Sequence, residues 1–154
     1  MLFRSLTINA QPNIVFSTGT TAGTLTFTVD AGIFGLSGSP STSISTRPAI
    51  VAISSTGATS RANELDVVLA GFDNTYSIGA MSFAFFDRSG ASITSLSADF
   101  TANFKAFLQG QTAGSSFLMR VSFPVSGDVT QIGGVNVTLT NAAGVVTTPR
   151  LNFP

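Results

Sequence analysis

The stretch Val135-Asn136-Val137-Thr138-Leu139-Thr140 alternates strictly between apolar and polar side chains. Successive side chains of a β-strand point to opposite faces, so this period places Val135, Val137 and Leu139 on one face. β-Branched residues favour strands, and a polar opposite face is typical of an antiparallel sheet with one wet side. The stretch therefore predicts a half-buried antiparallel strand.

The same alternation recurs along the chain, with turn residues between the apolar rows. Asp87-Arg88-Ser89-Gly90 predicts a hairpin that leads into a strand at 91–96, and 126–128 and 141–144 are similar breaks. The other inward rows are Leu25, Phe27, Val29; Leu65, Val67, Leu69; Met81, Phe83, Phe85; and Phe117, Met119, Val121, Phe123, Val125. Many short strands separated by turns predict an all-β sandwich or barrel.

One segment departs from this pattern. Residues 99–108 place Phe100, Phe104, Phe107 and Leu108 at helical spacing. We expect one or two helical turns there, capped by Asp99 or Thr101. A short plug that closes one end of the sandwich explains them better than an amphipathic membrane or partner helix.

A polar segment at 41–48 ends in Pro48 and predicts an extended connector between two parts of the chain. The part at 47–154 has the size of one immunoglobulin-like sandwich of about 100 residues. The part at 1–46 is too short for a sandwich. It is either the end of a preceding β repeat or an extension packed on the main domain.

The N-terminal Met1-Leu2-Phe3-Arg4-Ser5 lacks the charged and apolar regions of a signal peptide. Leu-Phe-Arg-Ser is also what one reading frame of a common sequencing adapter encodes. We therefore expect a translated metagenomic fragment whose true N-terminus is lost. The alternative is that Leu2 and Phe3 simply begin a strand.

Several motifs together resemble the Ig-like and fibronectin-III-like repeats of large secreted or surface-anchored bacterial proteins. The resemblance covers most of the chain, and its motifs are structural. They are Gly19-Thr20-Thr21-Ala22-Gly23-Thr24-Leu25-Thr26-Phe27, Arg47-Pro48-Ala49-Ile50, Leu69-Ala70-Gly71-Phe72, Phe83-Ala84-Phe85-Phe86, Val125-Ser126-Gly127-Asp128 and Val135-Asn136-Val137-Thr138-Leu139-Thr140-Asn141. The resemblance implies an antiparallel Ig-like β-sandwich with extra N-terminal strands from an upstream unit, serving as a spacer, a stalk or a binding module.

The composition argues against most enzyme chemistry. The chain has no histidine and no cysteine, and its seven basic residues balance seven acidic ones. A Ser-His-Asp triad, a thiol nucleophile and a disulfide framework are therefore excluded. No basic patch suggests nucleic acid, and no apolar run reaches the roughly 20 residues of a membrane span. We expect a non-catalytic protein without a cofactor.

Acidic residues supply the remaining candidates for chemistry. Glu64 and Asp66 lie two apart, so they share one face of a strand, and exposure on an edge or outer strand explains them better than catalysis. Asp73, Asp87 and Asp128 are candidate calcium ligands in loops. No calcium-loop motif accompanies them, and each is better explained as a turn former.

We therefore expect a structural, spacer or interaction module of an extracellular or cell-surface bacterial protein, with neighbouring β domains of the same polypeptide as partners. Low lysine and abundant serine, threonine and glycine favour this location over the cytosol. One alternative is a module that binds carbohydrate or a surface, with Phe72 and Tyr76 near one loop. Another is a filament subunit, in which the first 46 residues donate a strand to a neighbour's open edge.

Overall fold

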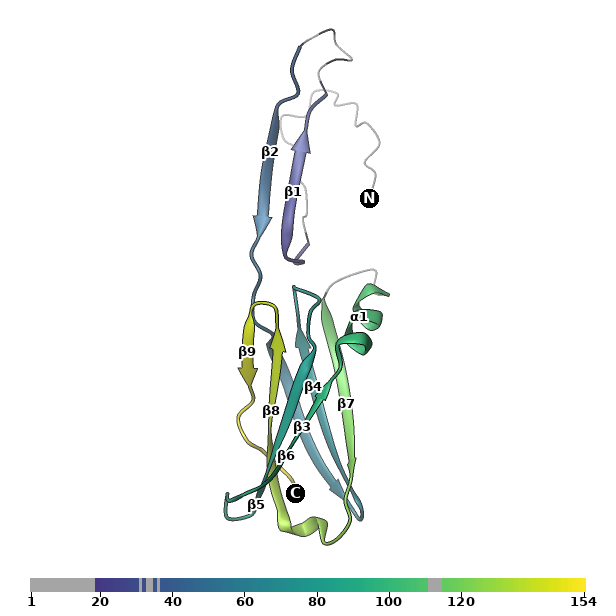
Figure 1. Cartoon of the computed structure of the whole chain (residues 1–154), viewed down its shortest axis with the longest axis vertical. Helices are drawn as coiled ribbons and strands as arrows, with labels where there is room; N and C mark the ends of the chain where they lie inside the picture. The colour runs from purple at the N-terminus through teal and green to yellow at the C-terminus, as the bar shows by residue number, and fades with distance from the viewer. Residues whose placement is uncertain (1–18, 31, 33–34, 36, 111–114) are drawn as a thin grey trace.

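The computed structural model describes residues 19–30, 32, 35, 37–110 and 115–154. Two antiparallel sheets pack against each other, and a two-stranded hairpin extends from one end of this sandwich along its long axis (Figure 1). The expected all-β sandwich with extra N-terminal strands is confirmed.

The sandwich consists of a three-stranded and a five-stranded sheet. The first has the order β3-β4-β7, with β3 at Ala52–Arg61, β4 at Glu64–Phe72 and β7 at Ser116–Pro124. The second has the order β10-β8-β5-β6, and β9 also pairs with β8. Its strands are β5 at Ala80–Asp87, β6 at Ser92–Asp99, β8 at Ile132–Asn141, β9 at Gly144–Thr147 and β10 at Leu151–Asn152.

The predicted inward rows form the core between the two sheets. Alternate residues of β4, β5 and β8 are buried, as the period of two requires: Leu65, Val67, Leu69, Met81, Phe83, Phe85, Val135, Val137 and Leu139. The row on β7 is only partly buried beyond Phe117, because β7 is an edge strand. Edge-to-face ring pairs join Phe123 to Phe83 at 4.8 Å and Phe117 to Phe104 at 5.3 Å between ring centroids.

The hairpin consists of β1 at Gly23–Thr28 and β2 at Ser41–Thr46. The expectation of a connector at 41–48 is therefore wrong for its first six residues. Ile44 pairs with Leu25 on one face, and hydroxyl pairs join Thr24 to Ser45 and Thr26 to Ser43 on the other. These cross-strand pairs hold the polar segment as a strand.

The expected helix is confirmed as α1, at Thr101–Gln109, near the hairpin end of the sandwich (Figure 1). Phe104 and Leu108 are buried, whereas Phe107 is exposed. The expectation that Asp99 or Thr101 caps the helix is wrong: Phe100 occupies the capping position and makes no side-chain cap hydrogen bond, although the Asp99 carboxylate before it accepts from the Thr101 amide. A short 3₁₀ helix, η2, follows at Val129–Gln131. Within the described residues, no helix has the length and apolarity needed to cross a membrane.

Besides β2, three strands have no counterpart in the sequence-based expectation: β3, β9 and β10. β3 contains mostly small and hydroxyl side chains and has no apolar alternation, so its place in the sheet depends on pairing with β4. β6 also extends to Asp99, beyond the expected 91–96, because Ala80 and Met81 of β5 pair with its last residues. Pairing with a strand that has a clear apolar alternation explains these elements.

The chain enters and leaves the sandwich at opposite ends. Residues 47–51 lead from the hairpin into β3, and β3 then runs away from the hairpin (Figure 1). The C-terminus lies at the far end, where the Ser60 hydroxyl donates to the Pro154 carbonyl over 3.0 Å.

Candidate functional site

The hairpin end of the sandwich contains a buried polar cluster, which we call the joint: Asp73, Asn74 and Asn141 with the backbone around them. Asp73 and Asn74 directly follow β4, and Asn141 ends β8, so both sheets contribute. All three side chains are buried. Buried polar groups are stable only when their hydrogen bonds are satisfied, so the partners of each define what the joint does.

Asp73 organises the loop between β4 and β5. Its carboxylate accepts five hydrogen bonds, from the Thr75 amide and hydroxyl, the Ser77 and Ile78 amides and the Asn141 side chain. Burial by itself would raise the pKa of the Asp73 carboxyl. The hydrogen bonds outweigh burial and lower the pKa below its usual value, so the carboxylate stays ionised.

Asn74 connects this loop to the segment that leaves the hairpin. Its side-chain amide donates to the Arg47 carbonyl over 2.9 Å, and its side-chain carbonyl accepts from the Ala49 amide over 2.9 Å. Its backbone carbonyl also accepts from the Ala22 amide over 2.7 Å, next to β1. One residue of the sandwich therefore holds both ends of the hairpin.

Asn141 completes the joint from the other sheet. Its side-chain amide donates to the Ala49 carbonyl over 2.8 Å and to Asp73 over 2.9 Å. Its side-chain carbonyl accepts from the Ala143 and Gly144 amides, which closes the turn between β8 and β9. The segment at Ala49 is thus hydrogen-bonded on both its amide and its carbonyl.

Tyr76 adds a further contact between the hairpin and the sandwich. The Thr21 hydroxyl donates to the Tyr76 hydroxyl over 3.2 Å. Tyr76 has φ +52°, a left-handed conformation that is uncommon for a residue with a side chain. The Asp73 hydrogen bonds to Thr75, Ser77 and Ile78 surround this position and fix the loop around it.

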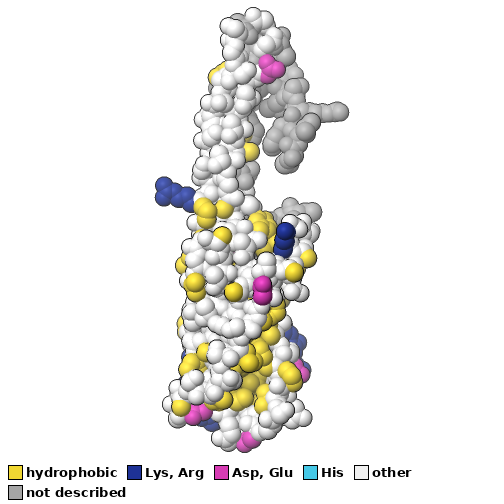
Figure 2. Space-filling model, viewed as in Figure 1, with side chains coloured by type: hydrophobic (Ala, Val, Ile, Leu, Met, Phe, Trp, Pro, Cys, Tyr) yellow, Lys and Arg dark blue, Asp and Glu magenta, His cyan; other side chains and the backbone are white. Residues whose placement is uncertain are grey.

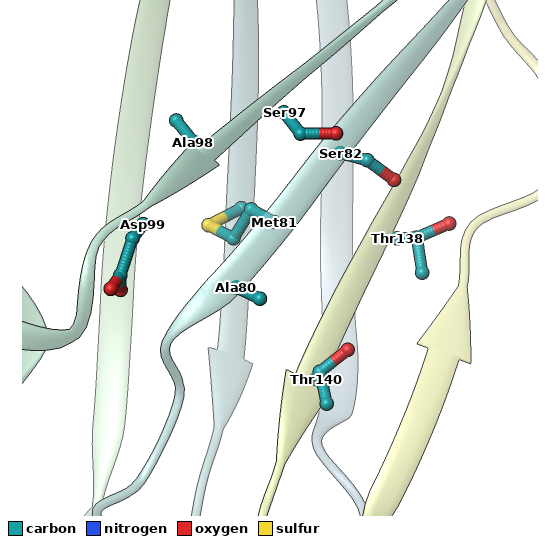
Figure 3. Close-up of a pocket in the computed structure, with 8 residues that line it drawn as sticks. All are labelled: Ala80, Met81, Ser82, Ser97, Ala98, Asp99, Thr138 and Thr140. Atoms are coloured by element: carbon teal, nitrogen blue, oxygen red, sulfur yellow. The ribbon is translucent and has the colours of Figure 1, made fainter.

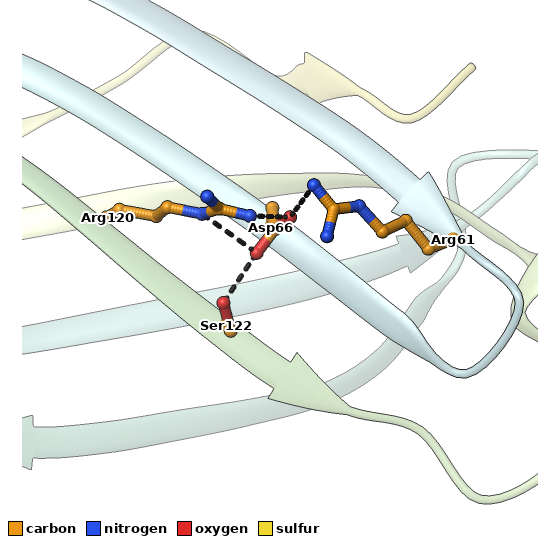
Figure 4. Close-up of polar contacts among 4 residues, drawn as sticks. All are labelled: Arg61, Asp66, Arg120 and Ser122. Carbon is orange, nitrogen blue, oxygen red and sulfur yellow. Dashed lines mark hydrogen bonds and ion pairs between the residues drawn. The ribbon is translucent and has the colours of Figure 1, made fainter.

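A second polar cluster lies on the outer face of the three-stranded sheet (Figure 4). Asp66 accepts hydrogen bonds from the Arg120 guanidinium and the Ser122 hydroxyl across the β4-β7 pair, and Arg61 lies 3.6 Å away. The expectation that Asp66 is exposed on an edge or outer strand is wrong: β4 is central, and Asp66 is 2% exposed. Asp66 nevertheless lies on the outer face of the sheet, where the exposed side chains of Arg61 and Arg120 cover it.

The groups that cover Asp66 keep its carboxylate ionised. The hydrogen bonds from Arg120 and then Ser122 lower the pKa of Asp66 to about 2, against a smaller effect of burial. The same contact with Asp66 raises the pKa of Arg120. A carboxylate paired in this way serves poorly as a general acid or base near neutral pH. The cluster is a structural ion pair across two strands.

The three calcium candidates lie at two different ends of the sandwich. Asp73 belongs to the joint, whereas Asp87 and Asp128 lie in turns at the far end. Asp87 accepts hydrogen bonds from Ser89 and the Ala91 amide, and Asp128 accepts from the Thr130 amide and hydroxyl. These bonds are those of turn-forming residues, and they lower the pKa of each carboxyl.

The structure therefore does not bring the three candidates into one site. Within the described part of the chain, no three acidic, histidine or cysteine residues are grouped as metal ligands. A role in calcium binding stays a prediction. The sequence did not identify Asn74 and Asn141 as joint residues. The available signal was their position: each lies at or just after the end of an apolar row, where a polar side chain is placed at the end of a sheet.

A shallow groove of about 310 Å³ crosses the outer face of the five-stranded sheet (Figure 3). Small and hydroxyl side chains form most of its lining, together with Met81 and Asp99: Ala80, Ser82, Ser97, Ala98, Thr138 and Thr140. Ligand pockets of proteins are mostly lined by large apolar and aromatic side chains. None of the residues that line this groove is aromatic, so it offers no ring against which a sugar could stack.

No protein-family model, no curated protein and no solved structure matches this chain.

Proposed function

We propose that this chain is a non-catalytic spacer module of a secreted or surface-exposed bacterial protein, and that the joint fixes the direction of the segment before it. One observation carries this proposal. The chain enters the sandwich through the joint at one end and leaves at the opposite end (Figure 1). A module of this kind separates whatever precedes it from whatever follows it.

The joint supplies the rigidity that a spacer needs. Asn74 bonds to Arg47, Ala49 and Ala22, and Asn141 bonds to Ala49 from the other sheet. Interfaces between domains of one chain permit relative motion unless the contacts are extensive. Buried hydrogen bonds on both sides of the hairpin base oppose a hinge there.

The strand order supports the proposed kinship with Ig-like repeats. In chain order, the first, second and fifth strands of the sandwich form one sheet, and the others form the second sheet. Immunoglobulin-like sandwiches combine two antiparallel sheets through crossovers of this Greek-key kind. The fourth strand, β6, pairs with β5, which is the side on which variable-type domains extend their sheet.

The surface suits a structural module. Figure 2 shows few charged side chains on the face in view, which is largely white, with apolar side chains gathered over the lower half of the sandwich. The whole chain has only 14 charged residues. Such a surface provides neither strong electrostatic steering nor the charged groups on which most catalysis depends.

A glycan-binding role receives less support. Phe107 is the one strongly exposed aromatic residue in the described part of the chain, at 44%. Phe72 and Tyr76, the loop aromatics suggested by the sequence, are half-buried, and Tyr76 packs against the core. A flat sugar-binding platform needs several exposed rings.

The proposal can be tested by single-molecule energy transfer on the whole chain. The chain has no cysteine, so Ser39→Cys in the hairpin loop and Ser126→Cys at the far end would carry the only dyes. We expect one narrow distance distribution. Asn74→Ala should broaden it, because the bonds to Arg47 and Ala49 are lost.

Asn103→Ala, on the exposed face of α1, is the matched control and should leave the distribution unchanged. A broad distribution in the parent protein, equal to that of Asn74→Ala, would show that the joint does not fix the hairpin. The spacer proposal would then be wrong.

A further inference from the structure

The edge of the five-stranded sheet formed by β6 has few of the features that normally prevent strands from associating: its irregularity at Ile93 and its charge at Asp99 lie near its two ends. β6 pairs with β5 on one side and ends the sheet on the other. All eight of its residues are exposed, and Ser92 to Ala98 include no charge, proline or glycine. Natural proteins protect exposed edges with lysine, proline, bulges or a covering element, because unpaired backbone groups recruit other strands.

β2 in the hairpin presents a second edge of the same kind. It pairs with β1 on one side, and in the described part of the chain no strand pairs with its other side. Its sequence, Ser-Thr-Ser-Ile-Ser-Thr, also has no charge or proline. Ile44, in the middle of β2, is 51% exposed.

The pairing of β2 with β1 shows which sequence β2 accepts as a partner. Leu25 lies opposite Ile44, and Thr24 and Thr26 lie opposite Ser45 and Ser43. Both hydroxyl pairs are hydrogen-bonded, at 2.9 and 2.8 Å between the oxygens. The partner is therefore a leucine between two hydroxyl residues.

β6 contains the same arrangement as Ser95-Leu96-Ser97. Leu96 is 46% exposed although it lies opposite the buried Phe83 in the sheet. Nothing in the described chain covers the outer edge of this motif. The free edge of β6 thus repeats the pattern to which β2 already binds.

We propose that β2 of one molecule pairs in antiparallel fashion with the β6 edge of a second copy, with Ile44 opposite Leu96. In this register Ser45 lies opposite Ser95 and Ser43 opposite Ser97, so hydroxyls meet hydroxyls and apolar side chains meet on the other face. All six residues of β2 find partners within the eight of β6. Backbone hydrogen bonds give such an added strand its affinity, and the side-chain pairs set its register.

The direction of the strands determines the form of the assembly. β2 runs toward the sandwich, and β6 runs toward the hairpin end, where α1 follows it (Figure 1). Antiparallel pairing therefore aligns the two molecules in the same direction, displaced along their long axis. The donor uses its hairpin and the acceptor its sandwich, so each copy keeps one free surface. Such a head-to-tail contact that does not close generates an open chain.

A cysteine cross-link tests the register, because the parent chain has no cysteine. Proteins carrying Ser43→Cys and Ser97→Cys are mixed under mild oxidation. Directly opposed residues of paired strands have Cβ atoms about 4.5–5.5 Å apart, close to the separation in a disulfide. We expect a disulfide-linked heterodimer to form at least about tenfold faster than between Ser43→Cys and Ser126→Cys, the control at the far end. Equal rates for the two mixtures would overturn the proposal.

Light scattering on the whole chain provides a second, independent measurement. We expect mass to rise with concentration and Ser97→Lys, a charge on the edge, to suppress the rise. Ser126→Lys is the control with the same charge and should leave assembly intact. Circular dichroism should show both variants folded, since both positions are exposed.

This inference goes beyond the spacer role and does not depend on it. A parent protein that is monomeric at millimolar concentration, yet keeps the narrow distance distribution described above, would overturn strand pairing and leave the spacer proposal standing. Assembly with a broad distribution would do the reverse.

Discussion

The hairpin and the sandwich follow the same alternation of side chains but differ in what covers the apolar face. In β8 the alternation leaves Val135, Val137 and Leu139 fully buried, because the three-stranded sheet packs over them. In the hairpin the same pattern leaves Leu25 half-buried and Ile44 exposed. Alternation is therefore sufficient to form a strand, but a second layer is needed to turn the strand into a core.

This difference implies unequal stability. An isolated two-stranded hairpin is marginally stable in water, whereas two packed sheets form a cooperative unit. The hairpin gains its anchorage from the joint, through Asn74 and its bonds to Arg47 and Ala49. We expect the sandwich to unfold as one unit and the hairpin to contribute little to its free energy of unfolding.

The largest effect should come from the centre of the sandwich. Phe83→Ala removes a buried ring that contacts Phe123, and it should lower the free energy of unfolding by about 3–5 kcal/mol. Urea unfolding followed by circular dichroism measures this loss. Phe117→Ala, where the ring packs on Phe104, should cost a similar amount. A change below about 0.5 kcal/mol at Phe83 would show that this face does not form the core.

The joint should give the next largest effect. Asp73→Asn keeps the shape of the side chain but replaces an oxygen that accepts backbone hydrogen bonds with a donor. Leaving buried donors unsatisfied costs roughly 1–3 kcal/mol, so we expect a loss in that range by urea unfolding. Asp128→Asn, in an exposed turn, is the matched control and should lose less. Equal losses would mean that the joint is no more than an ordinary turn.

Acid should weaken the sandwich, because the carboxylates of Asp66 and Asp73 then become protonated. The pKa values of Asp73 and Asp66 are lowered in the folded state, that of Asp66 to about 2, below the roughly 3.9 of an unfolded aspartate. Their contribution is complete above about pH 4 and is lost as pH falls through the folded pKa values. We expect the urea midpoint to fall between about pH 4 and pH 2, and Asp73→Asn to reduce this dependence. A midpoint that rises on acidification would contradict the lowered pKa values.

The smallest effect should come from the hairpin. Leu25→Ala shortens a half-buried side chain that faces Ile44. The free energy of unfolding of the sandwich should change by less than about 0.5 kcal/mol, as for substitutions away from a packed core. Urea unfolding monitored at the sandwich checks this. A loss comparable with that of Phe83→Ala would show that the hairpin and the sandwich share one core.

The sequence predicted the parts of the fold that depend on local pattern. The inward rows of β4, β5 and β8 and the helix at Thr101–Gln109 follow directly from apolar spacing. The sequence does not predict β2 and β3 as strands, because their small and hydroxyl side chains form no row of large apolar residues at alternate positions.

The joint and the Asp66 cluster were beyond sequence reasoning for a related reason. Asp66 and Arg120 are far apart in the chain and meet only because β4 pairs with β7. Asn74 and Asn141 meet Ala49 only because three segments converge at one end of the sandwich. Turn residues can be identified from sequence, but the contacts that they make across sheets depend on the register of the whole fold.

Native-state hydrogen exchange on the whole chain, at a concentration where it is monomeric, tests the contrast between the two regions most directly. We predict that amides of β4, β5 and β8, such as Val137, exchange only through global unfolding. Amides of β1 and β2 that pair across the hairpin should exchange at least about 100-fold faster. Protection of Leu25 and Ile44 equal to that of Val137 would contradict the division into a self-sufficient sandwich and a dependent hairpin.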